Sequence, residues 1–189
     1  MSTIRRHHVA FSRRIRRRKL DLEAAFAAVP LAVSDAAREA AQELSRLGIR
    51  HVLCGGLAVG AYGYPRATKD VAFLVGEEAF EHHGTIVTLK APFEVRGVAV
   101  DSVPVPAEAP FLARELDAFD AKKGLAVVSI GALVFMKLLA GRKRDIADVT
   151  ELAKAGADMK AVEEYLALHA SDRLDDFRDI VREAEAEEP

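Results

Sequence analysis

Apolar and polar positions divide the chain into a front part of short apolar runs and a back part with helical spacing throughout. The front runs are bounded by glycine and proline, a length and punctuation typical of buried strands. The predicted strands cover residues 49–54, 71–75, 85–89, 93–95, 98–103 and 125–129. Helical segments lie between and after them, so the pattern predicts an α+β fold with a small mixed β-sheet flanked by helices.

The clearest helix of the front part has an apolar stripe over residues 35–47, with Ser34 or Asp35 as the expected N-cap and Gly48 at its end. Weaker helical patterns cover residues 21–33, 57–62, 77–83 and 111–119. The back part predicts four helices, over residues 131–141, 145–155, 159–170 and 172–188. We therefore expect three parts, which are an arm over residues 1–20, a core over 21–129 and a helical region over 130–189.

Composition places the chain among globular proteins, because half of its 189 residues are apolar and 30% are charged. No apolar run reaches the roughly 18 residues of a membrane span. The basic start lacks the apolar stretch and small-residue cleavage site of a secretory signal. Cys54 is the single cysteine, so no internal disulfide can form. We expect a cytoplasmic protein.

Charge is distributed unevenly although the net charge is only −2. Residues 1–20 carry eight Arg and Lys and no acidic residue, which leaves 19 basic against 29 acidic side chains elsewhere, about −10. Such an arm would hold the phosphates of an RNA in a salt-dependent way. It could equally dock on an acidic partner, including the acidic tail over residues 172–189 of another copy.

Candidate chemistry centres on the junction after the first predicted strand. Gly55-Gly56 follows that strand, and glycines at such a turn let the backbone approach an anionic ligand closely. Asp70 opens the next strand, and position 72 would point to the same side. Paired carboxylates at these positions bind hard divalent cations such as Mg²⁺. Asp101, on a later strand, is placed to complete a two-metal site for nucleotidyl transfer.

Two motifs together carry a resemblance to a known family. Gly55-Gly56, thirteen residues and then Asp70 followed by a hydrophobic residue resemble the signature of the nucleotidyltransferase superfamily, whose members have a polymerase-β-like core. The sequence is most similar to AbiE-type toxins, whose Arg-x-Thr-x-Asp run is matched by Arg66, Thr68 and Asp70. Residues 129–148 resemble their lysine-bearing helix and following Arg-x-x-Asp-x-x-Asp segment. The likeness covers residues 46–155 and is carried by the two motifs in order.

The resemblance implies an enzyme that transfers a nucleotide from an NTP, with Mg²⁺, to a tRNA 3′ end or a protein hydroxyl. It also implies a toxin with an antitoxin protein as its partner. The catalytic residues would be Asp70, Asp101 and Lys137, with Asp70 and Asp101 as the metal ligands. The implied nucleotide contacts are Gly55, Gly56, Arg66, Lys69, Arg142 and Asp145.

Several of these side chains also have an ordinary structural interpretation. Lys137 could be an edge residue that extends to solvent, and Arg142 could cap a helix C-terminus. Asp145 could hold Lys137 or Arg142 in place. Asp148 lies in the first turn of a predicted helix, where stabilisation of the helix dipole is a sufficient explanation.

Position 72 departs from the motif, because Ala72 stands where the pattern has a carboxylate. An alanine methyl cannot bind a cation, so we expect this chain to be inactive or impaired. The intact surroundings favour an aspartate deliberately replaced by alanine, and a natural pseudoenzyme is the alternative. A nucleotide-, RNA- or partner-binding module without catalysis, and a purely structural protein, remain competing hypotheses. The enzyme interpretation requires Asp70 and Asp101 to meet beside the diglycine turn.

Overall fold

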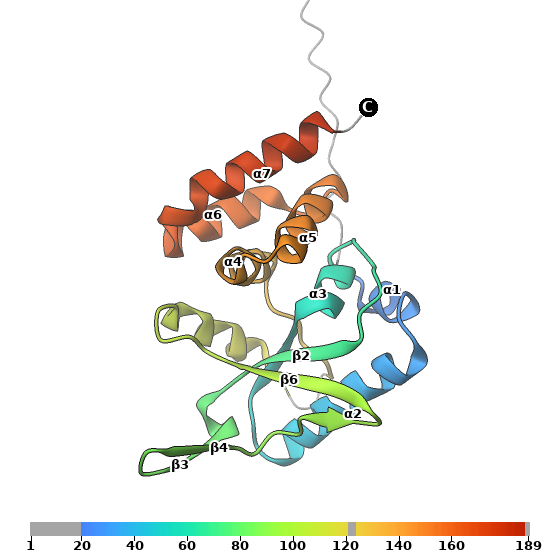
Figure 1. Ribbon diagram of the computed structural model, residues 1–189, viewed down its shortest axis with the longest axis vertical. Helices are drawn as coiled ribbons and strands as arrows, with labels where there is room; N and C mark the ends of the chain where they lie inside the picture. The colour runs from blue at the N-terminus through green and yellow to red at the C-terminus, as the bar shows by residue number, and fades with distance from the viewer. Residues whose placement is uncertain (1–19, 121–123, 188–189) are drawn as a thin grey trace, which may run out of the picture.

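The computed structural model describes residues 20–120 and 124–187 of the chain. A small sheet with its helices forms one layer, and the helices of the back part are stacked above it (Figure 1). Apart from Leu20, the predicted basic arm over residues 1–20 lies outside the described residues. Within the two described stretches, every helix is too short or too polar to cross a lipid bilayer.

The α+β class is confirmed by the succession of elements. The α-helices are α1 (Leu22–Ala27), α2 (Leu31–Arg46), α3 (Gly55–Ala61), α4 (Ile130–Ala140), α5 (Lys143–Lys154), α6 (Met159–His169) and α7 (Leu174–Ala186). The strands are β1 (His51–Cys54), β2 (Asp70–Val75), β3 (Phe80–His83), β4 (Ile86–Leu89), β5 (Glu94–Val95) and β6 (Val98–Pro104). Short 3₁₀ helices are η1 (Glu77–Ala79), η2 (Pro110–Ala118) and η3 (Ser171–Arg173).

The main sheet has four strands in the order β1-β2-β6-β5. Strand β2 is antiparallel to β1 and parallel to β6, and β5 is antiparallel to β6, so the sheet is mixed. Strands β3 and β4 form a separate hairpin, most of whose side chains are exposed. This topology puts β2 and β6, the strands with the candidate carboxylates, side by side in the centre of the sheet.

The two faces of the sheet contact different helices, because side chains alternate along a strand. Val71, Phe73 and Val75 pack in one buried cluster with Leu44 and the alanines of α2. Leu74 belongs to a second cluster, on the other face. Each fully buried Leu or Phe of this kind stabilises the fold by about 1.5–3 kcal/mol.

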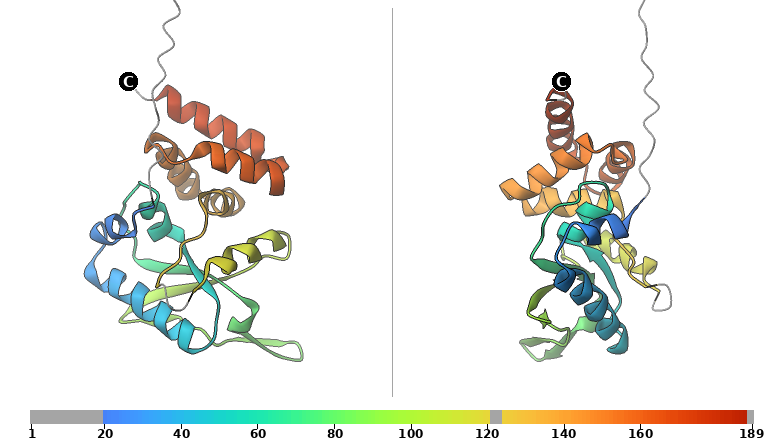
Figure 2. Two further views of the ribbon diagram at one scale, coloured as in Figure 1. Left: turned by 180° about the vertical axis from the view of Figure 1, so that it is seen from behind. Right: turned by 90° about the vertical axis from the view of Figure 1, so that its right-hand side faces the viewer.

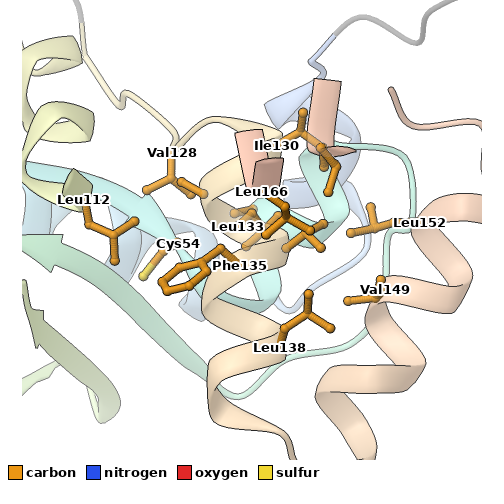
Figure 3. Close-up of a cluster of buried hydrophobic side chains, with 14 of the residues drawn as sticks. Cys54, Leu112, Val128, Ile130, Leu133, Phe135, Leu138, Val149, Leu152 and Leu166 are labelled. Atoms are coloured by element: carbon orange, nitrogen blue, oxygen red, sulfur yellow. The ribbon is translucent and has the colours of Figure 1, made fainter. Parts of the chain in front are cut away.

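The second cluster joins the sheet to the helical region. Figure 3 shows side chains of β1, η2 and three C-terminal helices meeting there, among them Cys54, Leu112, Leu133, Leu152 and Leu166. Helices α6 and α7 lie beyond α4 and α5, away from the sheet (Figure 2). The back part therefore shares a hydrophobic core with the front part.

Helix α4 lies between the two parts, and its sequence explains both of its ends. The Ser129 side chain accepts a hydrogen bond from the Ala132 backbone N–H as the N-cap. Gly141 closes the helix in the left-handed conformation, with φ of 61°. The predicted boundary between residues 129 and 130 thus falls at this cap.

Three secondary-structure predictions were wrong. The long helix begins at Leu31 after Pro30, whose φ of −55° suits a helix start, and Ser34 lies inside the first turn instead of capping it. Residues 77–83 form one 3₁₀ turn followed by strand β3. Residues 125–129 form only a bridge between Val127 and Leu53, because Ser129 already caps the next helix.

Candidate functional site

The two candidate metal ligands lie on the same face of the sheet. Asp101 of β6 is the register partner of Ala72 on β2, and Asp70 pairs with Ala99. Since partners in parallel strands point to the same side, Asp70, Ala72 and Asp101 share one face. Both aspartates are exposed, and neither forms an ion pair with another described residue. The predicted placement of the carboxylates on one face is confirmed.

The diglycine turn lies directly against this face. Gly55 has φ of +65°, and a Cβ added to it would come within 2.9 Å of the Ala72 Cβ. A Cβ on Gly56 would come within 2.9 Å of Thr68 Oγ1. Helix α3 begins at Gly55 itself, two residues earlier than the sequence predicts. The turn packs so closely against Ala72 and Thr68 that neither position 55 nor position 56 has room for a Cβ. Glycine is therefore needed at both positions.

Thr68 fixes the orientation of Asp70. Its side chain is buried, at 5% exposure, and its Oγ1 donates a hydrogen bond of 2.5 Å to Asp70 Oδ1. Sequence reasoning noted Thr68 only as part of a motif. The geometry gives it a defined role, which is to hold one carboxylate oxygen of Asp70.

Five charged side chains form a connected network beside this face. Lys137 Nζ lies 2.7 Å from Asp145 Oδ1 and 2.8 Å from Asp148 Oδ2. Arg66 donates two hydrogen bonds to Asp148, from Nε (2.6 Å) and Nη2 (2.8 Å). Arg142 Nε donates to Asp145 Oδ2 at 2.5 Å. The three inner residues are almost fully buried, with exposed fractions of 7% for Lys137, 1% for Asp145 and 2% for Asp148.

The two carboxyls of this network remain charged in spite of their burial. Burial alone would raise the pKa of Asp148, but hydrogen bonds from Arg66 and Lys137 outweigh it and lower the pKa below its usual value. The pKa of Asp145 is lowered in the same way, against burial, by hydrogen bonds from Arg142 and Lys137. Three cations thus neutralise two buried anions and leave one positive charge.

Arg142 connects the network to the exposed aspartates. Its pKa is raised chiefly by the hydrogen bond to Asp145, and the charges of Asp70 and Asp101 contribute to the same shift. Arg142 is itself exposed. The carboxylate face and the cationic network are therefore electrostatically coupled.

Several sequence interpretations change as a result. Lys137 is neither an edge residue nor a free cation, because it is buried between two aspartates. Asp148 does more than stabilise a helix dipole, because it binds both Arg66 and Lys137. The interpretation that Asp145 holds Lys137 or Arg142 is confirmed, and the structure shows both contacts. Lys69 is exposed and makes no hydrogen bond or ion pair with another described residue.

The exposed carboxylates Asp70 and Asp101 fit one hard cation, which takes oxygen ligands. No group of three or more His, Cys, Asp or Glu able to hold a metal occurs in residues 20–120 and 124–187. Mg²⁺ commonly binds through one or two carboxylates plus substrate phosphates, a requirement that Asp70 and Asp101 meet. A two-metal site would need a further carboxylate at position 72. When bound, Mg²⁺ would neutralise charge on the phosphates.

Cys54 is not a ligand in this arrangement. It is fully buried at the end of β1, and burial raises the pKa of its thiol to about 12. A thiol in this state is protonated at neutral pH and behaves as a small apolar side chain. Cys54 is therefore a core residue.

Comparison with known proteins does not assign the chain to a class. No family model matches it, and no curated protein matches its sequence. The functional argument therefore depends on the site itself.

Substituting Gly55 tests the close approach of the turn to position 72. We expect Gly55→Ala to destabilise the protein by about 2–4 kcal/mol, because alanine is strained at positive φ and its Cβ would overlap the Ala72 Cβ. Gly48→Ala is the matched control, since Gly48 has φ of +71° with nothing within 4 Å. Chemical denaturation of both variants isolates the overlap, and equal losses would contradict it.

Proposed function

We propose that this chain is a nucleotidyltransferase-type protein that binds an NTP with Mg²⁺ on the face carrying Asp70 and Asp101. We further propose that Ala72 leaves its transfer chemistry impaired. The supporting observation is the pairing of Ala72 with Asp101 beside Gly55, with Asp70 two residues away on the same face. Asp70, Asp101 and the glycine turn thus lie around position 72, where the family motif has a carboxylate and this chain has alanine.

A purely structural explanation accounts less well for this arrangement. Aspartates that only start a strand or end a turn do not need to share a face. Asp70 has one oxygen held by Thr68, and Asp101 has no ion-pair partner among the described residues. Their negative charges lie near Arg142. Such a combination of exposed anions and a nearby cation suits a nucleotide–metal complex, which carries both signs of charge.

The proposed reaction transfers a nucleotidyl group to an acceptor hydroxyl. The hydroxyl oxygen forms a bond to the α-phosphorus of the NTP while the bond to the pyrophosphate oxygen breaks, and the hydroxyl proton is lost. The resemblance described above supports a tRNA 3′ end or a protein hydroxyl as the acceptor. On the same basis we propose that the active form is a toxin and has an antitoxin protein as its partner.

Calorimetry with an NTP tests the binding half of this proposal. We expect the unmodified chain to bind ATP or GTP in Mg²⁺ and to lose affinity when EDTA removes the metal, because the cation would join the phosphates to the two carboxylates. Asp70→Asn and Asp101→Asn should each cause a comparable loss. Asp172→Asn, which changes an exposed aspartate on η3, is the control and should bind normally. Equal binding by all variants, or no binding at all, would count against the proposal.

A binding module without catalysis is the second candidate, and Ala72 favours it. Such a module would show the same metal-dependent binding and no transfer, even with a carboxylate restored at position 72. The two candidates therefore differ in one measurement, which is transfer by the Ala72→Asp variant.

A further inference from the structure

The segment that leads into Asp70 has no regular structure of its own. Residues 64–68 lie between helix α3 and strand β2 without helix or strand hydrogen bonds. Asp70 is the first residue of β2, so its position depends on how this segment is held. The segment must be fixed by side-chain contacts.

Arg66 provides the strongest of these contacts. Its guanidinium donates in bidentate geometry to Asp148 of helix α5, at 2.6 Å and 2.8 Å. Bidentate arginine–carboxylate pairs are geometrically specific, and this one is largely buried on both sides. Arg66 Nη1 and Arg144 Nη2 both donate to the Ala67 carbonyl oxygen, at 3.2 Å and 3.3 Å. Helix α5 therefore holds residue 66 through Asp148 and residue 67 through Arg144 in its first turn.

Helix α5 is a rigid support for this contact. Val149 and Leu152 are fully buried in the second hydrophobic cluster, immediately after Asp148. Asp148 is also fixed by Lys137 of α4 at 2.8 Å. A carboxylate held by two helices in this way has little freedom, so the guanidinium that it binds is fixed as well.

The same segment contacts the diglycine turn on its inner side. Thr68 Oγ1 and Arg66 Nη1 both lie next to Gly56, at 2.9 Å and 3.4 Å from the place of a Cβ there. Thr68 in turn donates to Asp70 Oδ1. Asp148 thus holds Arg66, and Thr68, two residues further along the same segment, holds Asp70.

We propose that Asp148 is a positioning residue for the cation site, and that it acts on Asp70 through Arg66 and Thr68. Arg66 is then a support for the segment and not a nucleotide contact. The inference rests on the proposed function in taking Asp70 and Asp101 as the cation ligands. It goes beyond that function because it assigns control of the site to the C-terminal helical region.

Manganese binding to the protein alone tests this assignment without any catalytic readout. Mn²⁺ stands in for Mg²⁺ and is followed by electron paramagnetic resonance of the free ion. Outer partners of metal ligands typically contribute about 10–100-fold in affinity. We expect Arg66→Gln and Asp148→Asn each to weaken Mn²⁺ binding at least about 10-fold, and the double variant to bind no more weakly than either, because both break one path. Arg50→Gln breaks a bidentate pair away from the site, with Glu78, and should leave Mn²⁺ affinity unchanged.

Amide hydrogen exchange tests the positioning separately from the metal. In metal-free protein, exchange at residues 66–70 should rise in Arg66→Gln and Asp148→Asn and stay unchanged in Arg50→Gln. Arg66→Gln keeps the buried Lys137–Asp148 pair, so it separates loss of positioning from general unfolding.

The outcomes distinguish the inference from the proposed function. Tight Mn²⁺ binding by all variants, or unchanged exchange at residues 66–70, would overturn the positioning role of Asp148. Failure of the unmodified chain to bind Mn²⁺ would overturn the proposed cation site. The exchange measurement would then still decide whether Asp148 holds the segment.

Discussion

Ala72→Asp should raise nucleotide transfer at least about 100-fold above that of the unmodified chain. Position 72 is the register partner of Asp101 and lies two residues from Asp70 on the same face. A carboxylate there would give the face three acidic side chains, the number that a two-metal arrangement uses. An effect of 100-fold corresponds to about 2.7 kcal/mol of transition-state stabilisation, a modest demand for metal-assisted chemistry.

Radiolabelled NTP with Mg²⁺ and total RNA, or total protein, measures this transfer and reports the acceptor class at the same time. Ala99→Asp is the matched control, since Ala99 is an exposed alanine on the same face and the register partner of Asp70. Adding Asp101→Asn to Ala72→Asp should abolish the gain. If Ala99→Asp gains as much, added charge alone explains the result. A silent Ala72→Asp variant would favour the binding module.

Much of the fold could be predicted from the sequence because its elements are defined locally. The short apolar runs bounded by glycine and proline correspond to strands β1, β2 and β6, and the uninterrupted helical spacing after residue 129 corresponds to four helices. The face shared by Asp70 and position 72 also followed from the alternation of side chains along a strand. These are consequences of backbone periodicity, which needs no knowledge of distant contacts.

The network around Lys137 could not be predicted in the same way. Asp148 in the first turns of a helix has a sufficient local explanation, and its pairing with Arg66 joins residues 82 positions apart. The only local signal was the spacing of Arg142, Asp145 and Asp148, which places three charges on one side of α5. These charged side chains form a network only when the helices pack together and bury them. The network therefore depends on tertiary packing, which the spacing alone does not reveal.

The same limit explains the errors in secondary structure. Residues 125–129 have strand-like composition, yet only Val127 bridges to β1. Ser129 has a second use, because its N–H and hydroxyl donate to Glu115 and its oxygen caps α4. Residues 125–129 could either pair as a full strand or end in the N-cap of α4. Tertiary contacts decide between the two, so residue preferences alone gave the wrong result.

The described cations of the site bind the buried pair of aspartates and not the exposed pair on the sheet face. Asp145 and Asp148 are bound by Lys137, Arg66 and Arg142, whereas no cation among residues 20–120 and 124–187 is bound directly to Asp70 or Asp101. The buried pair would need to lose cations before it could bind a metal. The exposed pair needs only to lose water. The network is therefore structural, and the expected cost of breaking it is large.

Lys137→Met should destabilise the protein by about 3–5 kcal/mol at pH 7. The substitution keeps the apolar stem of the side chain but leaves two buried carboxylates without the cation between them. Asp148 keeps Arg66 and Asp145 keeps Arg142, but each buried carboxylate loses a charge-assisted hydrogen bond, and the two anions no longer have a cation between them. Chemical denaturation measures the loss. Lys154→Met on α5 is the control, since its pairs with Glu151 and Glu187 are partly solvent-exposed and should contribute little to stability.

The deficit of Lys137→Met should also shrink as the pH falls from 7 to 5. In the unmodified protein the pKa values of Asp145 and Asp148 are lowered, so their stabilising contribution is present above about pH 4 and is lost only below it. Without Lys137, only Arg142 and Arg66 oppose the effect of burial on Asp145 and Asp148, so the pKa of both carboxyls rises above that in the unmodified protein. Proton uptake in the folded state then relieves the repulsion between the two carboxylates as the pH falls. A deficit that stays constant between pH 7 and pH 5 would mean that lost packing, and not buried charge, destabilises the variant.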